Sequence, residues 1–96
     1  MGDRRFAMRL PRADQVDLCW QDQAGQIQQT IAELADISRS GASVRSERPL
    51  RIGSALSLKY QDQDFPCTVR HCVRRGAGYL LGIEFTPGHR WAPRAR

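Results

Sequence analysis

The chain has 96 residues, 41% of them hydrophobic, which is enough for one domain (residues 1–96) with a single modest core. Fifteen basic against ten acidic residues give a net charge of +5, which favours anionic partners such as nucleotides, nucleic acid or acidic proteins. No apolar run approaches the ~20 residues of a membrane helix, and the basic N-terminus lacks the apolar segment of a secretory signal. We therefore expect a cytoplasmic protein without membrane insertion.

The first third of the chain predicts an arm followed by a strand and a turn. Residues 1–14 are polar, rich in arginine and interrupted by Pro11, a pattern typical of a flexible basic arm. Val16–Trp20 alternates apolar and polar residues and predicts a half-buried strand. Asp22–Gly25 is a polar turn in which glycine can adopt a positive φ.

Residues Gln26–Ile37 are ambiguous between helix and strand. Ile27, Ile31 and Leu34 fit a helical stripe, and the segment is rich in good helix formers, so the pattern alone favours a helix. A period of two leaves a strand open as the alternative. It would place four apolar residues on one face, namely Ile27, Ile31, Ala35 and Ile37.

The remainder of the chain predicts short strands joined by polar or glycine-containing turns, which indicates a small antiparallel barrel over residues 15–86. The expected strands are Ala42–Arg45, Leu56–Tyr60, Phe65–Arg75 and Tyr79–Thr86. Alternation in the third of these assigns one face to Phe65, Cys67, Val69, His71 and Val73. In the short tail, residues 87–96, we expect Trp91 to pack back on the barrel.

The cysteines and histidines do not predict a metal site or a disulfide. Cys19, Cys67 and Cys72 form no CxxC pair, and only His71 and His89 accompany them. On one extended strand Cys67 and Cys72 would lie on opposite faces, roughly 16 Å apart and beyond disulfide reach. We expect reduced, structural thiols, no metal and no cofactor.

Two clusters carry chemistry suited to a nucleotide ligand. Arg4, Arg5 and Arg9 offer guanidinium groups that can clamp a phosphate, lie on a purine or pair with the O6 and N7 edge of guanine. Arg5 and Arg9 have the spacing RxxxR. A second cluster, Asp36–Gly41, begins twenty-seven residues after Arg9 and has the pattern DxSxxG. Its carboxylate can accept hydrogen bonds from N1 and the exocyclic amine of guanine, its hydroxyl can donate to a phosphate, and its glycine allows close approach.

These clusters, in this order, resemble the RxxxR and [DN]xSxxG motifs of PilZ domains, which are bacterial receptors for cyclic di-GMP. The resemblance spans roughly residues 4–86 and includes an ending, Gly82–Phe85, similar to the last barrel strand of the family. It implies an all-β, six-stranded antiparallel barrel and a strand rather than a helix at Gln26–Ile37. The tail departs from the family pattern because it is too short and proline-rich for a C-terminal helix.

The resemblance also implies a binding site and a role. The ligand-binding positions would be Arg5, Arg9, Asp36, Ser38 and Gly41. Arg4, directly before the first motif, implies two cyclic di-GMP molecules per protomer. A receptor of this size would pass its signal to a partner, an effector protein that no residue identifies.

Other functions fit the sequence less well. A degenerate PilZ domain that only docks a protein would not need both motifs intact. A small basic barrel that binds single-stranded nucleic acid is compatible with the charge, but the aromatic residues do not interleave with a basic strand face. No acid–base pair, Walker loop or HExxH motif is present, so we predict a non-enzymatic protein without catalytic residues.

Overall fold

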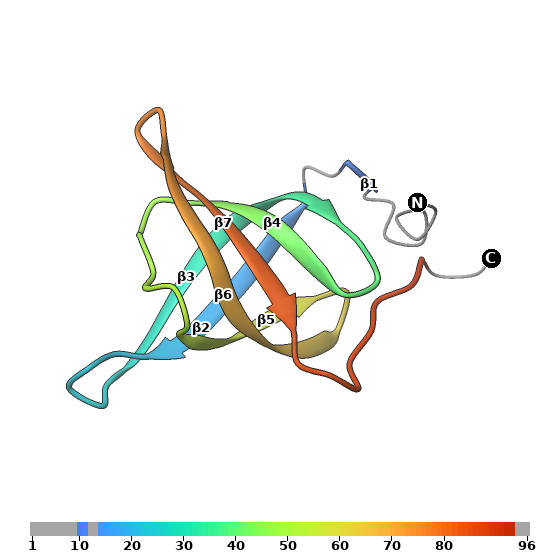
Figure 1. Ribbon diagram of the computed structural model, residues 1–96, viewed down its shortest axis with the longest axis horizontal. Coiled ribbons are helices and arrows are strands. Elements are labelled where there is room, and N and C mark those ends of the chain that lie inside the picture. The colour runs from blue at the N-terminus through green and yellow to red at the C-terminus, as the bar shows by residue number, and fades with distance from the viewer. Residues whose placement is uncertain (1–9, 12–13, 94–96) are drawn as a thin grey trace.

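The computed structural model describes residues 10–11 and 14–93, and every regular element in this part of the chain is a β-strand (Figure 1). The strands are β1 (Leu10–Pro11), β2 (Gln15–Gln21), β3 (Ile27–Ile37), β4 (Gly41–Ser46), β5 (Ala55–Tyr60), β6 (Gln63–Arg75) and β7 (Gly78–Phe85). Over the same residues, no helix has the length and apolar character needed to cross a membrane.

Six of these strands close into an antiparallel barrel, which confirms the expected fold. The hydrogen-bonded order is β3-β2-β5-β6-β7-β4, and β4 pairs again with β3 to complete the circle. Closure thus pairs the first and last strands of this order with each other. The two-residue β1 adds to β3 beyond the point where β2 begins. Within the expected flexible arm, Leu10–Pro11 therefore forms a paired strand.

The ambiguous segment is a strand, and the helix favoured by its pattern is wrong. The period-two assignment of faces is also wrong, because Ile27 and Ile31 are 67% and 59% exposed on the outer face. The core instead receives Ala32, Leu34 and Ile37. The buried positions of β3 change from even-numbered to odd-numbered residues at a β-bulge between Leu34 and Asp36. At this bulge β3 has one extra residue opposite β4.

A second bulge, in β6, changes which side chains of this strand face the core, so the expected faces are wrong beyond Val69. The register with β7 shifts between Val69 and His71, so the alternation reverses there. Val69 is buried, whereas His71 and Val73 are exposed on the outside. Cys72 packs against the core instead, on the same side as Cys67, and not on the opposite face as simple alternation predicted. All three cysteines are free.

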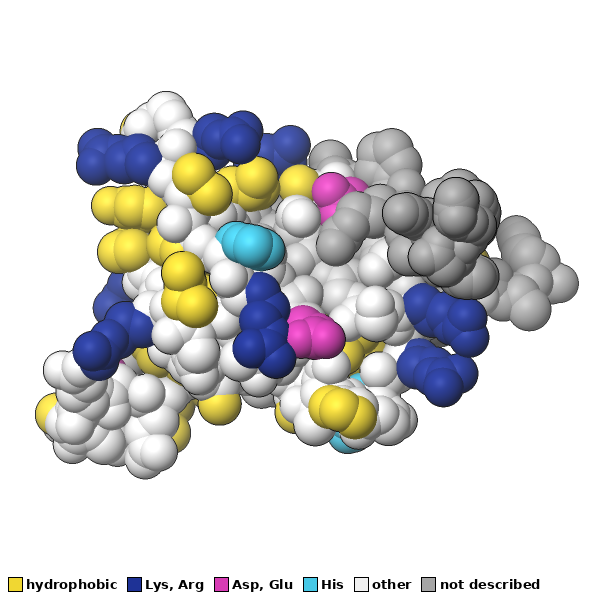
Figure 2. All heavy atoms as spheres, in the orientation of Figure 1, with side chains coloured by type: hydrophobic (Ala, Val, Ile, Leu, Met, Phe, Trp, Pro, Cys, Tyr) yellow, Lys and Arg dark blue, Asp and Glu magenta, His cyan; other side chains and the backbone are white. Residues whose placement is uncertain are grey.

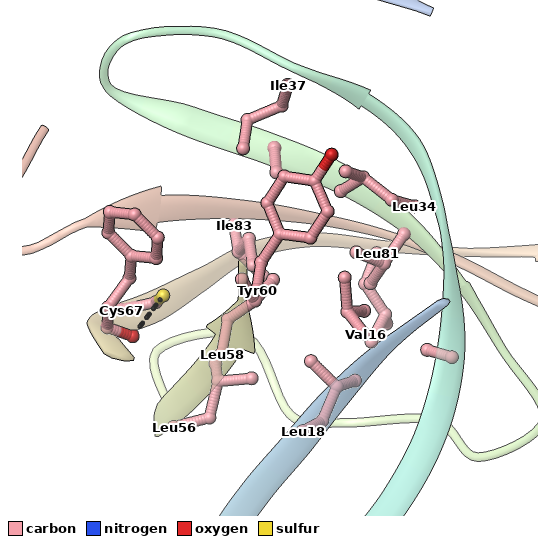
Figure 3. Packing of buried hydrophobic residues seen from close by; sticks show 14 of the residues in the cluster. Val16, Leu18, Leu34, Ile37, Leu56, Leu58, Tyr60, Cys67, Leu81 and Ile83 are labelled. Carbon is pink, nitrogen blue, oxygen red and sulfur yellow. Dashed lines mark hydrogen bonds between the residues drawn. The ribbon is translucent and has the colours of Figure 1, made fainter. Parts of the chain in front are cut away.

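The core lies inside the barrel and is built from the inward side chains of all six strands (Figure 3). Phe65 and Phe85 stack with ring centroids 4.6 Å apart. The Cys67 thiol donates to the Phe65 carbonyl oxygen at 2.9 Å, and burial raises the pKa of this thiol to about 12. Trp91, only 3% exposed, completes the core from the tail, as expected from the sequence.

Candidate functional site

The DxSxxG motif forms the tight connection between β3 and β4. The Ser38 backbone N–H and hydroxyl both donate to the Gly41 carbonyl oxygen, at 2.8 and 3.2 Å. Ser38 is 3% exposed. Its hydroxyl therefore stabilises the turn itself, which is the local role common to serine in such turns.

Gly41 is required by the neighbouring strand. A Cβ atom at this position would collide with the Ile83 carbonyl oxygen of β7 and would lie 3.4 Å from the Glu84 Cα. The Phe85 N–H also donates to the Ser40 carbonyl oxygen at 2.8 Å. The motif glycine thus lets β7 pack tightly beneath the turn, and its φ is not positive.

A bulge orients the acidic residue of the motif. Asp36 follows the irregularity in β3, pairs with Ser43 of β4 and is half-buried. Bulges commonly redirect a side chain next to a functional site. Here the bulge allows Asp36 to line an outer groove while the next residue, Ile37, is fully buried in the core.

That groove has a volume of about 1160 Å³ and runs along β3, β4 and the β6–β7 hairpin. Asp36, Ser43 and Ala35 line one end, and Arg75 and Leu80 lie farther along it. Typical small-ligand pockets are ~300–1,000 Å³, so the space is sufficient for a dinucleotide. Midway, Arg45 forms an exposed ion pair with Glu33, with 3.2 Å between Nη1 and Oε1.

The short strand β1 brings the two motifs toward each other. Leu10, the residue directly after RxxxR, pairs with Ile37, and Pro11 pairs with Asp36. Arg4, Arg5 and Arg9 themselves lie outside the described residues. The register therefore aligns the chain that leaves the first motif with the start of the second (Figure 1).

A cluster at the end of the barrel ties three segments together. The Trp91 N–H donates to the Arg39 carbonyl oxygen at 3.1 Å, within the motif turn, and the indole N–H donates to Gln61 Oε1 at 3.2 Å. The Trp91 and Tyr60 rings are 6.5 Å apart, and the Tyr60 hydroxyl donates to Asp14 Oδ2 at 2.6 Å. The tail and the last residue of the expected arm, Asp14, are thus both attached to this cluster.

The comparisons with known proteins agree with this architecture. The model of the PilZ domain family matches residues 3–90, which include both motifs. The chain belongs to the PilZ domain family. A solved structure of MrkH from K. pneumonia in its apo state superposes on this PilZ domain with a TM-score of 0.59 and 14% sequence identity, so the likeness concerns the fold. The alignment covers 85% of this chain and 43% of the MrkH chain, so the chain spans less than half of MrkH. No curated protein matches the sequence.

In this PilZ domain the three predicted residues of the second motif lie together but in different environments. Ser38 and Gly41 are buried in the turn, and Asp36 alone lines the groove. The sequence pattern did not indicate Ser43, Arg75 and Leu80, which share the groove with Asp36. Their proximity depends on strand register, which no local pattern indicates. Among the described residues, no cluster of three potential metal ligands occurs.

Proposed function

We propose that this protein is a non-enzymatic receptor that binds cyclic di-GMP through Arg5, Arg9 and Asp36. PilZ domains form a family of cyclic di-GMP-binding domains that are generally without enzymatic activity. The observation that carries the proposal is the pairing of β1 with β3, because Leu10 and Pro11 stand opposite Ile37 and Asp36. An arginine cluster on the chain that leads into β1 can then act together with the carboxylate.

The chemistry divides between the two motifs. The guanidinium groups of Arg5 and Arg9 would clamp phosphates and pair with guanine edges, since arginine offers a planar fork of donors. The Asp36 carboxylate would accept hydrogen bonds from guanine N1 and the exocyclic amine. Ser38 and Gly41 would contribute by shaping the turn that carries Asp36, and by exposing backbone close to the ligand.

We further propose two ligands per protomer and a protein partner. A second cyclic di-GMP brings two more phosphates and more purine surface, which Arg4 can neutralise or stack on. The groove beyond Asp36 gives room for more than one guanine. Because the protein would have no catalytic step, its output would be the recognition of the ligand-bound form by an effector protein.

Titration calorimetry with cyclic di-GMP tests this function. We expect a dissociation constant between nanomolar and micromolar, or roughly −8 to −12 kcal/mol, with a plateau at about two ligands per protein. Arg5→Ala and Arg9→Ala should each cost about 2–4 kcal/mol, because charge-assisted bidentate contacts are lost. Arg48→Ala is the matched control, because Arg48 lies over the Trp20 ring, 5.2 Å from its centroid, at the opposite end of β3.

The outcomes separate the candidate functions. Wild-type affinity in both motif variants would remove the assignment of the arginines, and a plateau at one ligand would remove the proposed pair. If the protein released no heat with cyclic di-GMP but bound oligothymidylate with a steep salt dependence, a single-strand-binding barrel would replace the receptor. The absence of both interactions would leave a protein-docking module.

A further inference from the structure

The register of the barrel connects Asp36 to a histidine that the motifs do not include. Asp36 pairs with Ser43, Ser43 with Gly82, and Gly82 with His71. Directly opposed residues in antiparallel strands share one face of the sheet. These four residues therefore form one row across β3, β4, β7 and β6 on the outside of the barrel.

The histidine reaches this face because of the bulge in β6. Without the register shift between Val69 and His71, the imidazole would follow Val69 into the core. Instead the side chain is exposed and lies over Gly82 of the adjacent strand. A Cβ atom at Gly82 would be 3.1 Å from His71 Cδ2 and 3.5 Å from its Cγ, so the ring occupies the space that the missing side chain leaves.

The residues between the imidazole and Asp36 are small. The imidazole lies over β7, and only Ser43 of β4 separates this strand from Asp36 in the row. At ~4.8 Å between neighbouring strands, the imidazole over β7 is two strand spacings, or about 10 Å, from Asp36 on β3, which suits a purine base with its sugar. Figure 2 shows histidine, acidic and basic side chains on the face that β6 and β7 present to the viewer, with small polar side chains and backbone among them.

The charged side chains beside the imidazole do not bind it. Arg70, which precedes His71 in the chain, and Glu84, two residues after Gly82, bind each other with 2.7 Å between Nε and Oε1. Within the described residues, the His71 imidazole takes part in no hydrogen bond and in no ion pair, and His71 is held only through the pairing of its backbone strand with β7. The fold positions this aromatic ring over a glycine without using its polar atoms.

We propose that His71 forms the end of the ligand site opposite Asp36, where its imidazole face stacks against a guanine of bound cyclic di-GMP. This proposal rests on the proposed function, because it extends the same site. Aromatic side chains bind unstacked bases in this way, and imidazole is one of the rings that do so. Ser43 is then the floor beneath the base, and Gly82 is the floor beneath the imidazole.

Calorimetry on variants at two positions tests the stacking contact. His71→Ala should weaken cyclic di-GMP binding about tenfold, at the lower end for a stacked base because imidazole is small. His71→Phe should retain most of the affinity, since the flat aromatic face remains. Gly82→Ala should also weaken binding by displacing the ring, but should have no further effect when combined with His71→Ala. Val73→Ala, in the next row of the same outer face, is the matched control and should bind as wild type.

A spectroscopic measurement separates stacking from a general change in stability. The chain has two histidines, so the His71 ring protons can be assigned in NMR spectra by comparison with His71→Phe. Saturating cyclic di-GMP should shift them upfield and leave those of His89 in place. If the wild type does not bind the ligand, the proposed function fails. If it binds, and His71→Ala binds equally or the ring protons do not shift, the role of His71 alone is wrong.

Discussion

The two turns at the ends of β3 have similar local chemistry but different surroundings. In the β2–β3 turn, Asp22 Oδ1 accepts from the N–H groups of Ala24 and Gln26, both at 2.9 Å. In the β3–β4 turn, Ser38 donates twice to Gly41. The first turn extends into solvent beside the exposed Ile27, whereas the second is packed against β7 (Figure 1).

This difference explains why only one turn suits a binding site. Short polar turns with a side-chain cap are common in proteins. The β3–β4 turn is additionally held by the backbone of β7 and by Trp91, so Asp36 next to it has a fixed position. A preorganised carboxylate binds a ligand without the cost of ordering a loop. Substitutions at the two turns, and the pH dependence of one of them, test this contrast.

Removal of Trp91 should have the largest effect. Trp91→Ala should lower the free energy of unfolding by about 3–5 kcal/mol, because a large buried side chain leaves a cavity beside the motif turn. Trp20→Ala is the control near the other turn. This ring is only partly buried, so its loss should cost less in urea denaturation. Equal losses for both variants would contradict the distinction between the two ends.

Addition of a methyl group at the glycine of each turn should reveal a second difference in stability between the two turns. Gly41→Ala should cost about 2–3 kcal/mol, because the backbone of β7 must shift away from the added Cβ. Gly25→Ala should cost about 1 kcal/mol, because Gly25 has a φ of 83° but open space around it. Thermal unfolding of both variants measures the difference. A larger loss for Gly25→Ala would show that local φ outweighs close packing.

An acid-to-amide substitution at each turn should weaken ligand binding at only one of the two turns. Asp36→Asn should weaken cyclic di-GMP binding about tenfold, because a charged acceptor is replaced by an amide whose NH₂ group faces the guanine donors. Asp22→Asn should bind with unchanged affinity. Parallel calorimetric titrations provide the measurement, and equal weakening by both would place the effect in overall charge rather than in the site.

The smallest effect should appear in the pH dependence of the stability that Asp22 contributes through the solvent-exposed turn. The Gln26 N–H, followed by the Gln28 amide, holds the pKa of Asp22 below its ordinary value of 3.8. The stabilising contribution of this carboxylate is therefore present above that value and is lost as the pH falls through the lowered pKa. The difference in thermal midpoint between wild type and Asp22→Asn should shrink on acidification. A constant difference from about pH 6 to pH 2 would exclude this contribution.

Several features of this protein could be predicted from the sequence because they are local. Alternation identified the strand at Val16–Trp20, and turn residues marked both ends of β3. The RxxxR and DxSxxG motifs identified the family, and that resemblance correctly made a strand of Gln26–Ile37 where periodicity favoured a helix.

The tertiary structure determined which face of each strand is buried and which residues far apart in the chain lie side by side. Bulges after Leu34 and Val69 reverse the alternation of β3 and β6, and a bulge arises from pairing with a partner strand, which a single segment does not specify. Barrel closure places β7 beneath Gly41, and strand register places His71 in the same row as Asp36. The sequence alone thus indicated the chemistry of one half of the proposed site, while the pairing of strands far apart in the chain determined that His71 stands across from it.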